Sequence, residues 1–483
     1  MTSLLRSVLS IFSGKVAGII IGFVFTPILV RIISQPQYGV YASVFAAYSI
    51  VTLISKGGLF DATRKMVSEY IGDKDTISSI VSTSLCLSVF YALIVSSIAI
   101  IITWTGIIPD IYIPYVWILA GLVLFRNIFA IIRGTLYGLQ HESIGEILKV
   151  SQRIVYSILA LLLAYIGYDV FGVFVAYVLS FVVFTGFGLV LLFRYSSYSL
   201  PEVADLTSYT HELVSFGGYQ LIGGISALLL YKSDILLVEF YEGTTSTALY
   251  QSAIIPAEMI WFVPSAIQLA FLQHTASLWS DDEIDKINEN IKIGVKYSVL
   301  SLALFGVGLF SLAEPFLAIY FGPEYTDSST VLQLLIIGTI FFGISRVIAP
   351  VFQATGLVKQ TELITVCALV VNISLNLILI PMYGIIGAGI GTATSYVVMF
   401  VGNFLLWIHS PFDLVPKDWV IKLVLVQSLF AVCFFTFVSW SNFPPLISLI
   451  VSPPVGLLLF LGMNVMAGFI PAWKIRSAVS QIG

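Results

Sequence analysis

Long apolar runs and short polar stretches alternate along the whole chain. A run of about 20 apolar residues is long enough to cross the hydrocarbon core of a bilayer as a helix. The pattern therefore predicts an all-α integral membrane protein with about 14 transmembrane helices. They are predicted at 8–32, 40–60, 79–103, 112–132, 148–168, 170–193, 214–240, 247–272, 292–313, 329–350, 362–381, 384–408, 419–439 and 444–470. The polar segment 35–39 is predicted to turn the chain after the first helix, and the links 168–170 and 381–384 leave room only for tight turns.

Glycines inside the apolar runs predict where helices approach each other closely. Gly14, Gly18 and Gly22 are spaced four apart, so they lie close to one face of the first helix. Small residues on one face allow another helix to pack closely within lipid. Gly387 and Gly391 have the same spacing. No strand precedes them, so they indicate helix packing and not a dinucleotide-binding loop.

Weak internal similarity predicts two halves built on one plan. Residues 131–138 (IIRGTLYG) resemble 347–354 (VIAPVFQA), and each segment ends the fourth predicted helix of its half. Six helices in each half would make both halves enter the membrane in the same direction, which is a parallel repeat. We therefore predict two six-helix bundles around a central cavity, followed by two C-terminal helices. The predicted parts are a first bundle at 1–193, a cytoplasmic linker at 194–213, a second bundle at 214–410, and two further helices with a cytoplasmic tail at 411–483.

Basic residues predict the orientation of the chain. Of the 22 Lys and Arg residues, 19 lie on one side of the predicted helices, Arg31 lies on the other side, and Arg126 and Lys232 lie within the membrane. The basic side includes Arg64, Lys65, Lys74, Arg133, Lys149, Arg194, Lys286, Lys359, Lys417, Lys474 and Arg476. Because Lys and Arg are enriched in cytoplasmic loops, both termini are predicted to be cytoplasmic. We expect a multi-pass protein of the plasma membrane.

Composition excludes several other classes of protein. The chain is 58% hydrophobic and only 10% charged, whereas roughly a quarter of the residues of a soluble protein are charged. A net charge of −4 without a basic block gives no support for nucleic-acid binding. The three cysteines are far apart and the four histidines are scattered, so we expect no disulfide framework, no metal site and no cofactor.

Several segments, taken in chain order, resemble one family. They are Thr26–Arg31 with the turn at Tyr38–Gly39, Gly58–Asp61 continuing to Glu69–Tyr70, Lys232–Leu237, and Ile380–Ala388. The chain resembles the oligosaccharide flippases, or polysaccharide biosynthesis proteins, of the multidrug/oligosaccharidyl-lipid/polysaccharide exporter superfamily. The resemblance covers nearly the whole chain. It implies a transporter that moves a lipid-linked sugar from the cytoplasmic to the outer leaflet.

Four basic residues of the first half are candidates for binding the substrate: Lys15, Lys56, Arg126 and Arg133. An ionisable side chain inside a membrane is costly and usually faces a partner or a water-filled cavity. One interpretation is that these side chains snorkel to the cytoplasmic interface. The other is a cationic lining that binds the head-group phosphate of a lipid carrier. The resemblance implies the second, because related lipid-linked peptidoglycan precursor flippases use cavity arginines on helices 1, 2 and 8. Helix 8 of this chain has no cation.

The second half offers a different set of charges. Glu258 lies near the middle of the eighth predicted helix, between Pro256 and Pro264. Paired helix breaks of this kind often mark a transport site. Lys232 and Asp234 lie in the seventh predicted helix. The three charged residues could form a structural ion pair between the two helices, or a switch that couples transport to an ion.

The sequence and the resemblance together predict a flippase and not an enzyme. It would move an oligosaccharide linked to polyprenyl or dolichyl phosphate or pyrophosphate to the outer leaflet by alternating access, for cell-surface glycan or protein glycosylation. Expected partners are this substrate, membrane lipid, H⁺ or Na⁺, and glycosyltransferases of the same pathway. The alternative is a cation-coupled multidrug exporter of the same superfamily, which the absence of Asp and Glu from the first helix disfavours. A membrane glycosyltransferase or polymerase is less expected, because the predicted outward loops are short.

Overall fold

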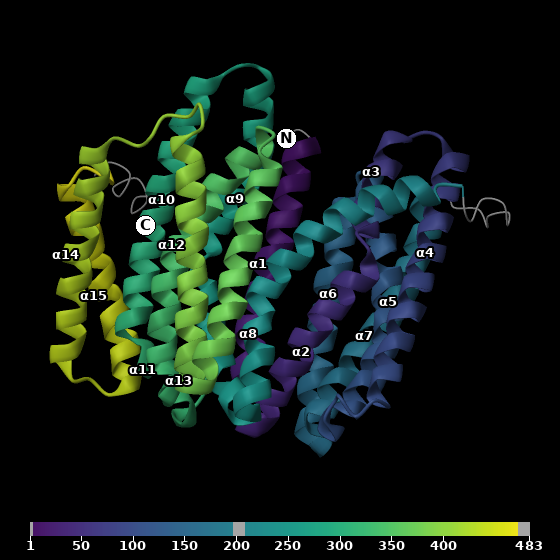
Figure 1. Ribbon diagram of the computed structural model, residues 1–483, viewed down its shortest axis with the longest axis horizontal. Helices are drawn as coiled ribbons and strands as arrows, with labels where there is room; N and C mark the ends of the chain where they lie inside the picture. The colour runs from purple at the N-terminus through teal and green to yellow at the C-terminus, as the bar shows by residue number, and fades with distance from the viewer. Residues whose placement is uncertain (1–2, 197–207, 472–483) are drawn as a thin grey trace, which may run out of the picture. The chain divides into compact units, whose positions relative to one another are not determined.

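The computed structural model describes residues 3–196 and 208–471, with side chains from Ser13 onward except those of Tyr219, Gln220, Ile222 and Gln273 (Figure 1). This part of the chain is helical and contains no β-strand. The helices of its first half are α1 Ser3–Ile32, α2 Gln35–Lys56, α3 Leu59–Glu69, α4 Lys74–Thr103, α5 Ile113–Gly138, α6 Glu142–Leu163 and α7 Asp169–Tyr195. They are followed by α8 Thr210–Met259, α9 Phe262–Ser280, α10 Ile284–Ser311, α11 Ala313–Tyr320, α12 Ser329–Ala354, α13 Val358–Ile408, α14 Lys417–Ser441 and α15 Pro445–Met466.

The predicted class of fold is confirmed. Ten described helical segments are long and apolar enough to cross a membrane, or up to 11 if a bent pair within α8 counts as one. Two of these segments, Glu142–Tyr195 and Val358–Ile408, have 54 and 51 residues, so each is long enough for two crossings. When these double crossings are counted, the number of spans agrees roughly with the predicted 14.

The two tight turns predicted from sequence lie where the backbone takes positive φ, at Gly384 and at Gly167 with Asp169. Gly384 interrupts α13 with φ 56° and ψ −138°, and Gly167 has φ 98° between α6 and α7. Glycine has no Cβ and adopts positive φ without steric cost, so it can end one helix and let the next begin at once. The two arms of α13 then pack on each other, because a Cβ built at Gly402 would lie 2.7 Å from the side chain of Ile364.

The start of the chain differs in detail from the prediction. The segment 35–39 was predicted to be a turn, but α2 already begins at Gln35. Pro36 is tolerated in the first helical turn, where the backbone N–H has no partner within the helix. The Ser34 backbone N–H donates to Gln37 Oε1 at 3.0 Å, which closes the helix start. The reversal is therefore limited to residues 33–34.

Two other predicted elements are also subdivided. The second predicted helix, 40–60, breaks at Gly57 and Gly58, and α3 follows as a separate amphipathic helix. The eighth, 247–272, breaks at Ile260 and Trp261, between the two prolines that suggested a break. The predicted outward loop at 314–328 is mostly helical and contains α11, and its Tyr325 is fully buried.

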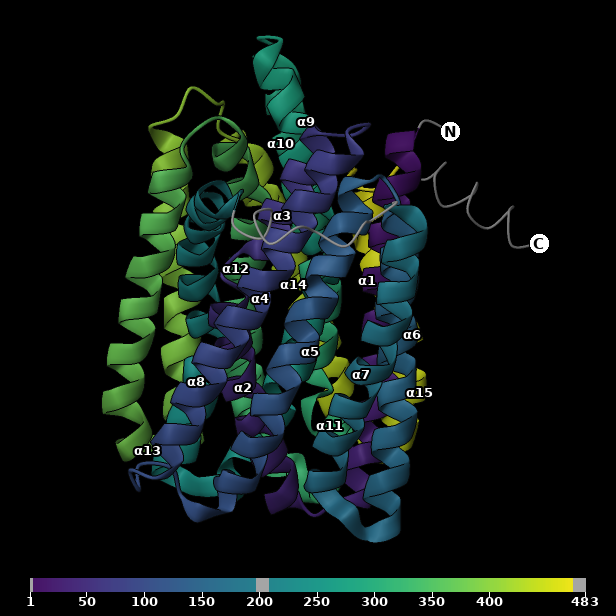
Figure 2. The same ribbon diagram turned by 90° about the vertical axis from the view of Figure 1, so that its right-hand side faces the viewer.

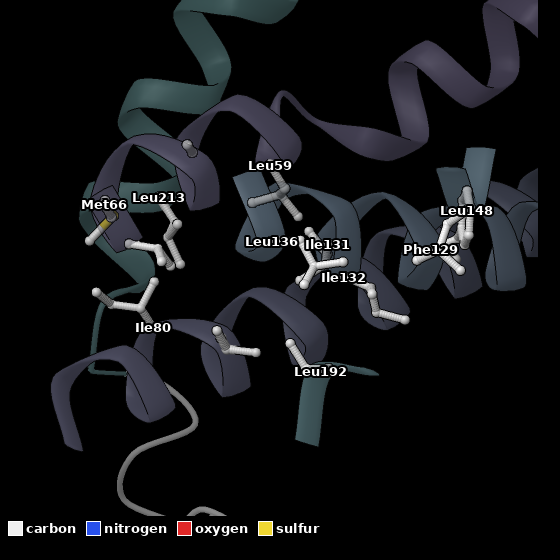
Figure 3. Close-up of a cluster of buried hydrophobic side chains, with 14 of the residues drawn as sticks. Leu59, Met66, Ile80, Phe129, Ile131, Ile132, Leu136, Leu148, Leu192 and Leu213 are labelled. Carbon is white, nitrogen blue, oxygen red and sulfur yellow. The ribbon is translucent and has the colours of Figure 1, made fainter. Parts of the chain in front are cut away.

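The chain divides into two compact units, Met1–Glu239 (unit 1) and Phe240–Gly483 (unit 2). Within unit 1, α4 and α5 run side by side (Figure 2). Buried side chains of α3, α4 and α5 form a hydrophobic core that includes Leu59, Met66, Ile80 and Leu136 (Figure 3). The exposed Asp73 starts α4: its carboxylate accepts hydrogen bonds from the Thr76 side chain and backbone N–H, and these hold the pKa of Asp73 below its usual range.

Within unit 2, α14 and α15 pack on each other and on α10 and α11. Their shared core contains Phe430, Phe434 and Phe460. The domain boundaries predicted from sequence, and the central cavity between the bundles, stay predictions. Part of the predicted linker 194–213, and the tail residues Lys474 and Arg476, lie outside the described residues.

Candidate functional site

Arg126 lies deep in unit 1, in the middle of α5. Its guanidinium carbon lies 4.9 Å from the centroid of the Tyr48 ring on α2. It also lies within electrostatic range of the Tyr177 hydroxyl on α7. Cation–π contacts of this kind stabilise a guanidinium without neutralising it. Among the described residues of unit 1, Arg126 forms no ion pair with a carboxylate. Its positive charge is therefore uncompensated by the helices around it.

The neighbouring Asn127 fixes the position of Arg126. Its side-chain amide donates to the backbone carbonyls of Ser55 on α2, at 2.9 Å, and Ser88 on α4, at 3.3 Å. The Ser55 hydroxyl donates back to Asn127 Oδ1 at 3.2 Å. Because these groups are buried, losing any one of them would leave a polar atom unsatisfied. The three helices are thereby held in one register around Arg126.

Lys56 ends α2 and lies close enough to Arg126 and Arg133 for their charges to repel. The carboxylate of Asp61, on α3, attracts it. The break at Gly57 and Gly58 brings these groups together, because α3 folds back against the end of α5. A Cβ built at Gly134 of α5 would lie only 2.8 Å from the Phe60 carbonyl oxygen. The structure thus brings Lys56 and Arg126 into one cluster.

Arg133 has a partner that the sequence did not reveal. It donates to Glu146 Oε1 at 3.2 Å, to the Tyr137 hydroxyl at 2.7 Å and to the Gly145 carbonyl at 3.2 Å. Glu146 is buried, and it also accepts from Lys149 at 3.1 Å and from Tyr137. From sequence Glu146 is an ordinary acidic residue near a helix start. In the structure it compensates the charges of Arg133 and Lys149.

Lys15 is exposed on α1, near Lys149 of α6. The close approach predicted for Gly14, Gly18 and Gly22 is confirmed, since α1 packs on α6. The glycine face makes room for charged side chains: a Cβ at Gly14 would overlap the Glu146 carboxylate, and one at Gly18 would lie 2.7 Å from Arg153 Nη1.

Arg153 is the residue of unit 1 that sequence reasoning missed. The charge count includes it among the cytoplasmic residues, because the helix predicted at 148–168 starts only five residues before it. The structure places it 11 residues beyond Glu142, the first residue of α6, which is roughly 16 Å along the axis at 1.5 Å per residue. Its guanidinium lies within electrostatic range of the Tyr41 and Tyr156 hydroxyls. Because the predicted helix starts at residue 148, the sequence alone did not reveal this depth.

The other three predicted residues lie in two different units. Lys232 is half-buried and Asp234 is fully buried in the part of α8 that belongs to unit 1. Asp234 Oδ1 accepts from the Ile235 backbone N–H at 2.9 Å. Glu258 is half-buried in unit 2 and lies just before the break between α8 and α9. The roles assigned to these residues stay predictions.

A second arginine missed from sequence lies at that break. Arg346 of α12 donates to Gln268 Oε1 at 3.0 Å and approaches the Ser265 hydroxyl at 3.4 Å, both on α9. Its guanidinium lies 4.6 Å from the ring of Trp261 and 4.8 Å from that of Phe342. Trp261 is the residue at which α8 gives way to α9. Arg346 and its aromatic neighbours thus hold the broken helix in place.

Neutral polar groups cross-link the rest of the interior of unit 2. Asn372 donates to Thr392 Oγ1 at 3.3 Å, Asn376 donates to Asn372 Oδ1 at 3.2 Å, and the Tyr250 and Thr392 hydroxyls lie 3.1 Å apart. These bonds tie both arms of α13 to α8. No cluster of three His, Cys, Asp or Glu residues that could hold a metal occurs in the described part of the chain.

These features define a class of protein: a multi-pass membrane transporter with intramembrane charges in its helical units. Comparison with known proteins specifies the family. Residues 4–269 match the family "Polysaccharide biosynthesis protein", and residues 155–447 match "Lipid II flippase MurJ". The first match covers more than half of the chain, so this chain belongs to the polysaccharide biosynthesis protein family.

Individual relatives match most of the chain. The chain is 26% identical to "Probable low-salt glycan biosynthesis flippase Agl15" of Haloferax volcanii, over 82% of this chain and 81% of that protein. It is 21% identical to "Uncharacterized membrane protein MJ1068" of Methanocaldococcus jannaschii, over 83% and 84%.

Solved structures share the fold at low sequence identity. "Lipid II flippase MurJ, inward closed conformation" matches with a TM-score of 0.74 and 14% identity, over 96% of this chain and 98% of that one. The inward-facing conformation of a multidrug resistance MATE family transporter matches with a TM-score of 0.65 and 17% identity, over 80% and 93%. At these identities the similarity concerns the fold alone.

Proposed function

We propose that the protein is a flippase that moves a lipid-linked oligosaccharide from the cytoplasmic to the outer leaflet of the plasma membrane. The observation that carries the proposal is the uncompensated positive charge of Arg126 in unit 1 of a protein from this family. The substrate carries its negative charge in the phosphate that links sugar to lipid. A guanidinium held in place by Tyr48 and Asn127 would bind such a phosphate by charge-assisted hydrogen bonds.

The four cations predicted from sequence would take different parts in this binding. Arg126 and Lys56 belong to one cluster and would contact the phosphate directly. Arg133 is held by Glu146, so it would attract the phosphate electrostatically and would not form a direct hydrogen bond to it. Lys15 is exposed on α1 and would attract the head group from the cytoplasmic leaflet.

Transport would follow alternating access, with the lipid tail remaining in the bilayer while the head group crosses. An inside-negative membrane potential favours outward movement of an anion by roughly 2.3 kcal/mol per charge per 100 mV. Lys232, Asp234 and Glu258 would couple the change of state to H⁺ or Na⁺. The protein would act as a transporter and not as an enzyme, and glycosyltransferases of the same pathway would supply its substrate.

Reconstitution tests the function directly. Proteoliposomes would contain the full chain and a polyprenyl diphosphate-linked sugar that carries a fluorophore, and an impermeant reductant would quench the outer leaflet. We expect the protein to make the inner-leaflet probe accessible with time, whereas empty liposomes keep it protected. Export of a cationic drug without movement of the lipid-linked sugar would favour the multidrug exporter instead.

The proposed orientation has its own test. Single cysteines would be placed at Gly106, Thr245 or Asp327 in a chain whose three native cysteines have been replaced. An impermeant thiol reagent outside intact cells should label these three positions and leave Asp75 and Asn288 unlabelled, because the Lys and Arg residues place the latter two in the cytoplasm. The reverse pattern would invert the proposed topology.

A further inference from the structure

An apolar crevice lies within unit 2, between α10, α12 and α14. Its volume is about 380 Å³, and its lining includes Gly306 and Phe310 of α10, Ile336 and Ile340 of α12, and Val432 and Phe435 of α14. Among the described residues that line it, none is charged, and the hydroxyl oxygen of Ser311 is buried. A water molecule needs several polar partners to be held in a protein. Water is therefore not a stable occupant of this crevice.

The packing of the three helices explains why the crevice is open. The helix α10 packs on both α12 and α14. Gly306 deepens the floor, because a Cβ built there would lie 3.3 Å from Ile340 Cδ1. The rings of Phe310 and Phe435 lie 6.3 Å apart, so α10 and α14 meet at their level. The crevice is thus the space that α12 and α14 leave between them on the surface of α10.

The crevice is continuous with the surface that faces the bilayer. Its lining residues Ile337, Val432 and Phe435 are 46%, 64% and 47% exposed. They lie in helical segments that are long and apolar enough to cross a membrane. Apolar side chains exposed on such segments contact lipid tails, which are as apolar as they are. Hydrocarbon therefore surrounds the mouth of the crevice.

The crevice has the depth of one leaflet. Phe310 is one residue before the end of α10, and Ile340 is 11 residues after Ser329, the first residue of α12. At 1.5 Å per residue, these positions lie roughly 2 Å and 16 Å from the helix ends. The hydrocarbon of one leaflet is about 15 Å thick. A lipid chain that enters beside the helix ends would reach Ile340 without leaving its leaflet.

The volume restricts the occupant to a slender chain. A helix with its side chains is about 10–12 Å across, so a single helical turn already fills more than about 400 Å³. A further transmembrane helix therefore cannot enter the crevice. The chain of a lipid is only one methylene group wide. Its entry is favoured, because an empty crevice would forfeit the dispersion contacts of its lining atoms.

We propose that this crevice binds one hydrocarbon chain of a resident phospholipid, and that the chain stabilises the packing of α14 on α10 and α12. The phospholipid belongs to the leaflet at the C-terminal end of α10. The carrier lipid of a flippase changes leaflet in every cycle, whereas the crevice spans one leaflet. A phospholipid that stays in its leaflet therefore matches the crevice, and the site is separate from the residues proposed for transport.

Photo-crosslinking of the wild-type protein tests the site. The full chain would be purified in detergent, which removes loosely held lipid, and given a phosphatidylcholine with a diazirine on one chain. We expect cross-links at 336–340 and 431–435, and none near Leu458, which is exposed on α15 outside the crevice. Dioleoyl phosphatidylcholine should compete with the probe and raise the unfolding temperature. Dihexanoyl phosphatidylcholine should do neither, because its chains are too short to reach Ile340.

Variants then assign the binding to the crevice. Ala431→Phe places a ring in the space that the lipid chain fills, so it should lose most of the cross-link and the response to dioleoyl phosphatidylcholine. Gly306→Ala fills the floor from α10 and should cause a smaller loss. The matched control is Leu425→Phe, an exposed position of α14 outside the crevice, which should behave as wild type. Thermal unfolding of each variant shows that it is folded.

Several results would overturn the proposal. Cross-links spread evenly over the exposed surface of wild type would show surface lipid only. A folded Ala431→Phe variant with the wild-type yield would place the lipid elsewhere. Competition by a polyprenyl phosphate alone would assign the crevice to the carrier, and cross-links to a second protein chain would assign it to a partner. The flippase function would be untouched by the first two results, because translocation is measured separately.

Discussion

The two units both place an arginine among aromatic rings on a corresponding helix, but they surround it differently. Arg126 lies on α5 and Arg346 on α12, the helices whose ends carry the similar segments 131–138 and 347–354. Arg126 has tyrosines and other cations around it. Arg346 has Gln268 and Ser265 as hydrogen-bond partners. The comparison suggests that unit 1 keeps charge available for an anion, whereas unit 2 uses its arginine to hold a helix break.

Glycines in the two units also leave space for different groups. In unit 1, Gly14 and Gly18 leave space for the charged ends of Glu146 and Arg153. In unit 2, a Cβ at Gly387 would overlap the Leu379 carbonyl, so that glycine lets two backbone segments touch. A small-residue spacing predicts close approach in both cases. It does not reveal whether a side chain or a backbone fills the space.

The largest expected effect concerns the compensated charges of unit 1. Glu146→Ala leaves Arg133 without its carboxylate in a site where Arg133 is only 16% exposed. Breaking a buried ion pair in this way costs about 3–5 kcal/mol. We expect a clear loss of thermal stability and of protein level in the membrane. Glu212→Ala, an exposed carboxylate at the start of α8, is the control. A fully stable Glu146→Ala protein would show that the pair does not stabilise unit 1.

The next effect concerns the intramembrane carboxylate of unit 2. Glu258→Gln should leave protein level near normal and reduce translocation, because a coupling of about 1–3 kcal/mol between ion binding and the change of state would be lost. The dependence of transport on pH or Na⁺ should disappear as well. Glu314→Gln, an exposed carboxylate of the same unit, is the control. A drop in protein level would indicate a structural ion pair instead, and unchanged transport would contradict both interpretations.

The smallest effect tests how unit 2 uses glycine. Gly387→Ala should destabilise the protein by about 1–3 kcal/mol, because the added methyl group forces the arms of α13 apart. Gly308→Ala provides the matched control, since nothing lies within 4 Å of a Cβ at that position. There the change should stabilise the helix by about 0.5–1 kcal/mol. Thermal unfolding in detergent measures both, and similar values would remove the packing role of Gly387.

The sequence predicted the class of fold and the positions of most crossings, because a bilayer imposes long apolar runs and an asymmetric distribution of Lys and Arg. It also predicted the tight turns and the break between Pro256 and Pro264. It could not show that Arg153 lies deep, because a cation one or two turns inside a helix can also reach the interface. Nor could it show that Arg133 has a carboxylate partner whereas Arg126 has none among the described residues of unit 1. Their difference depends on Glu146, which meets Arg133 only after α5 and α6 have packed.

In unit 2, too, the sequence could not reveal the contacts of a buried arginine. The charge count includes Arg346 among the cytoplasmic residues, because the helix predicted at 329–350 ends four residues after it. Its partners Gln268 and Trp261 come from another helix and have no sequence spacing that points to Arg346. Contacts between distant segments therefore decide which partners each arginine has, and the candidate site depends on these contacts.

The most direct test of the account compares the two arginines in one assay. Head-group translocation would be measured in proteoliposomes that contain equal amounts of folded Arg126→Gln, Arg346→Gln or wild-type protein. We expect Arg126→Gln to lower the initial rate by about tenfold or more, because it removes a charge-assisted contact with the phosphate. Arg346→Gln should stay close to the wild-type rate, since a glutamine keeps a donor for Gln268. Normal translocation by Arg126→Gln would contradict the central claim that the uncompensated charge of unit 1 binds the substrate.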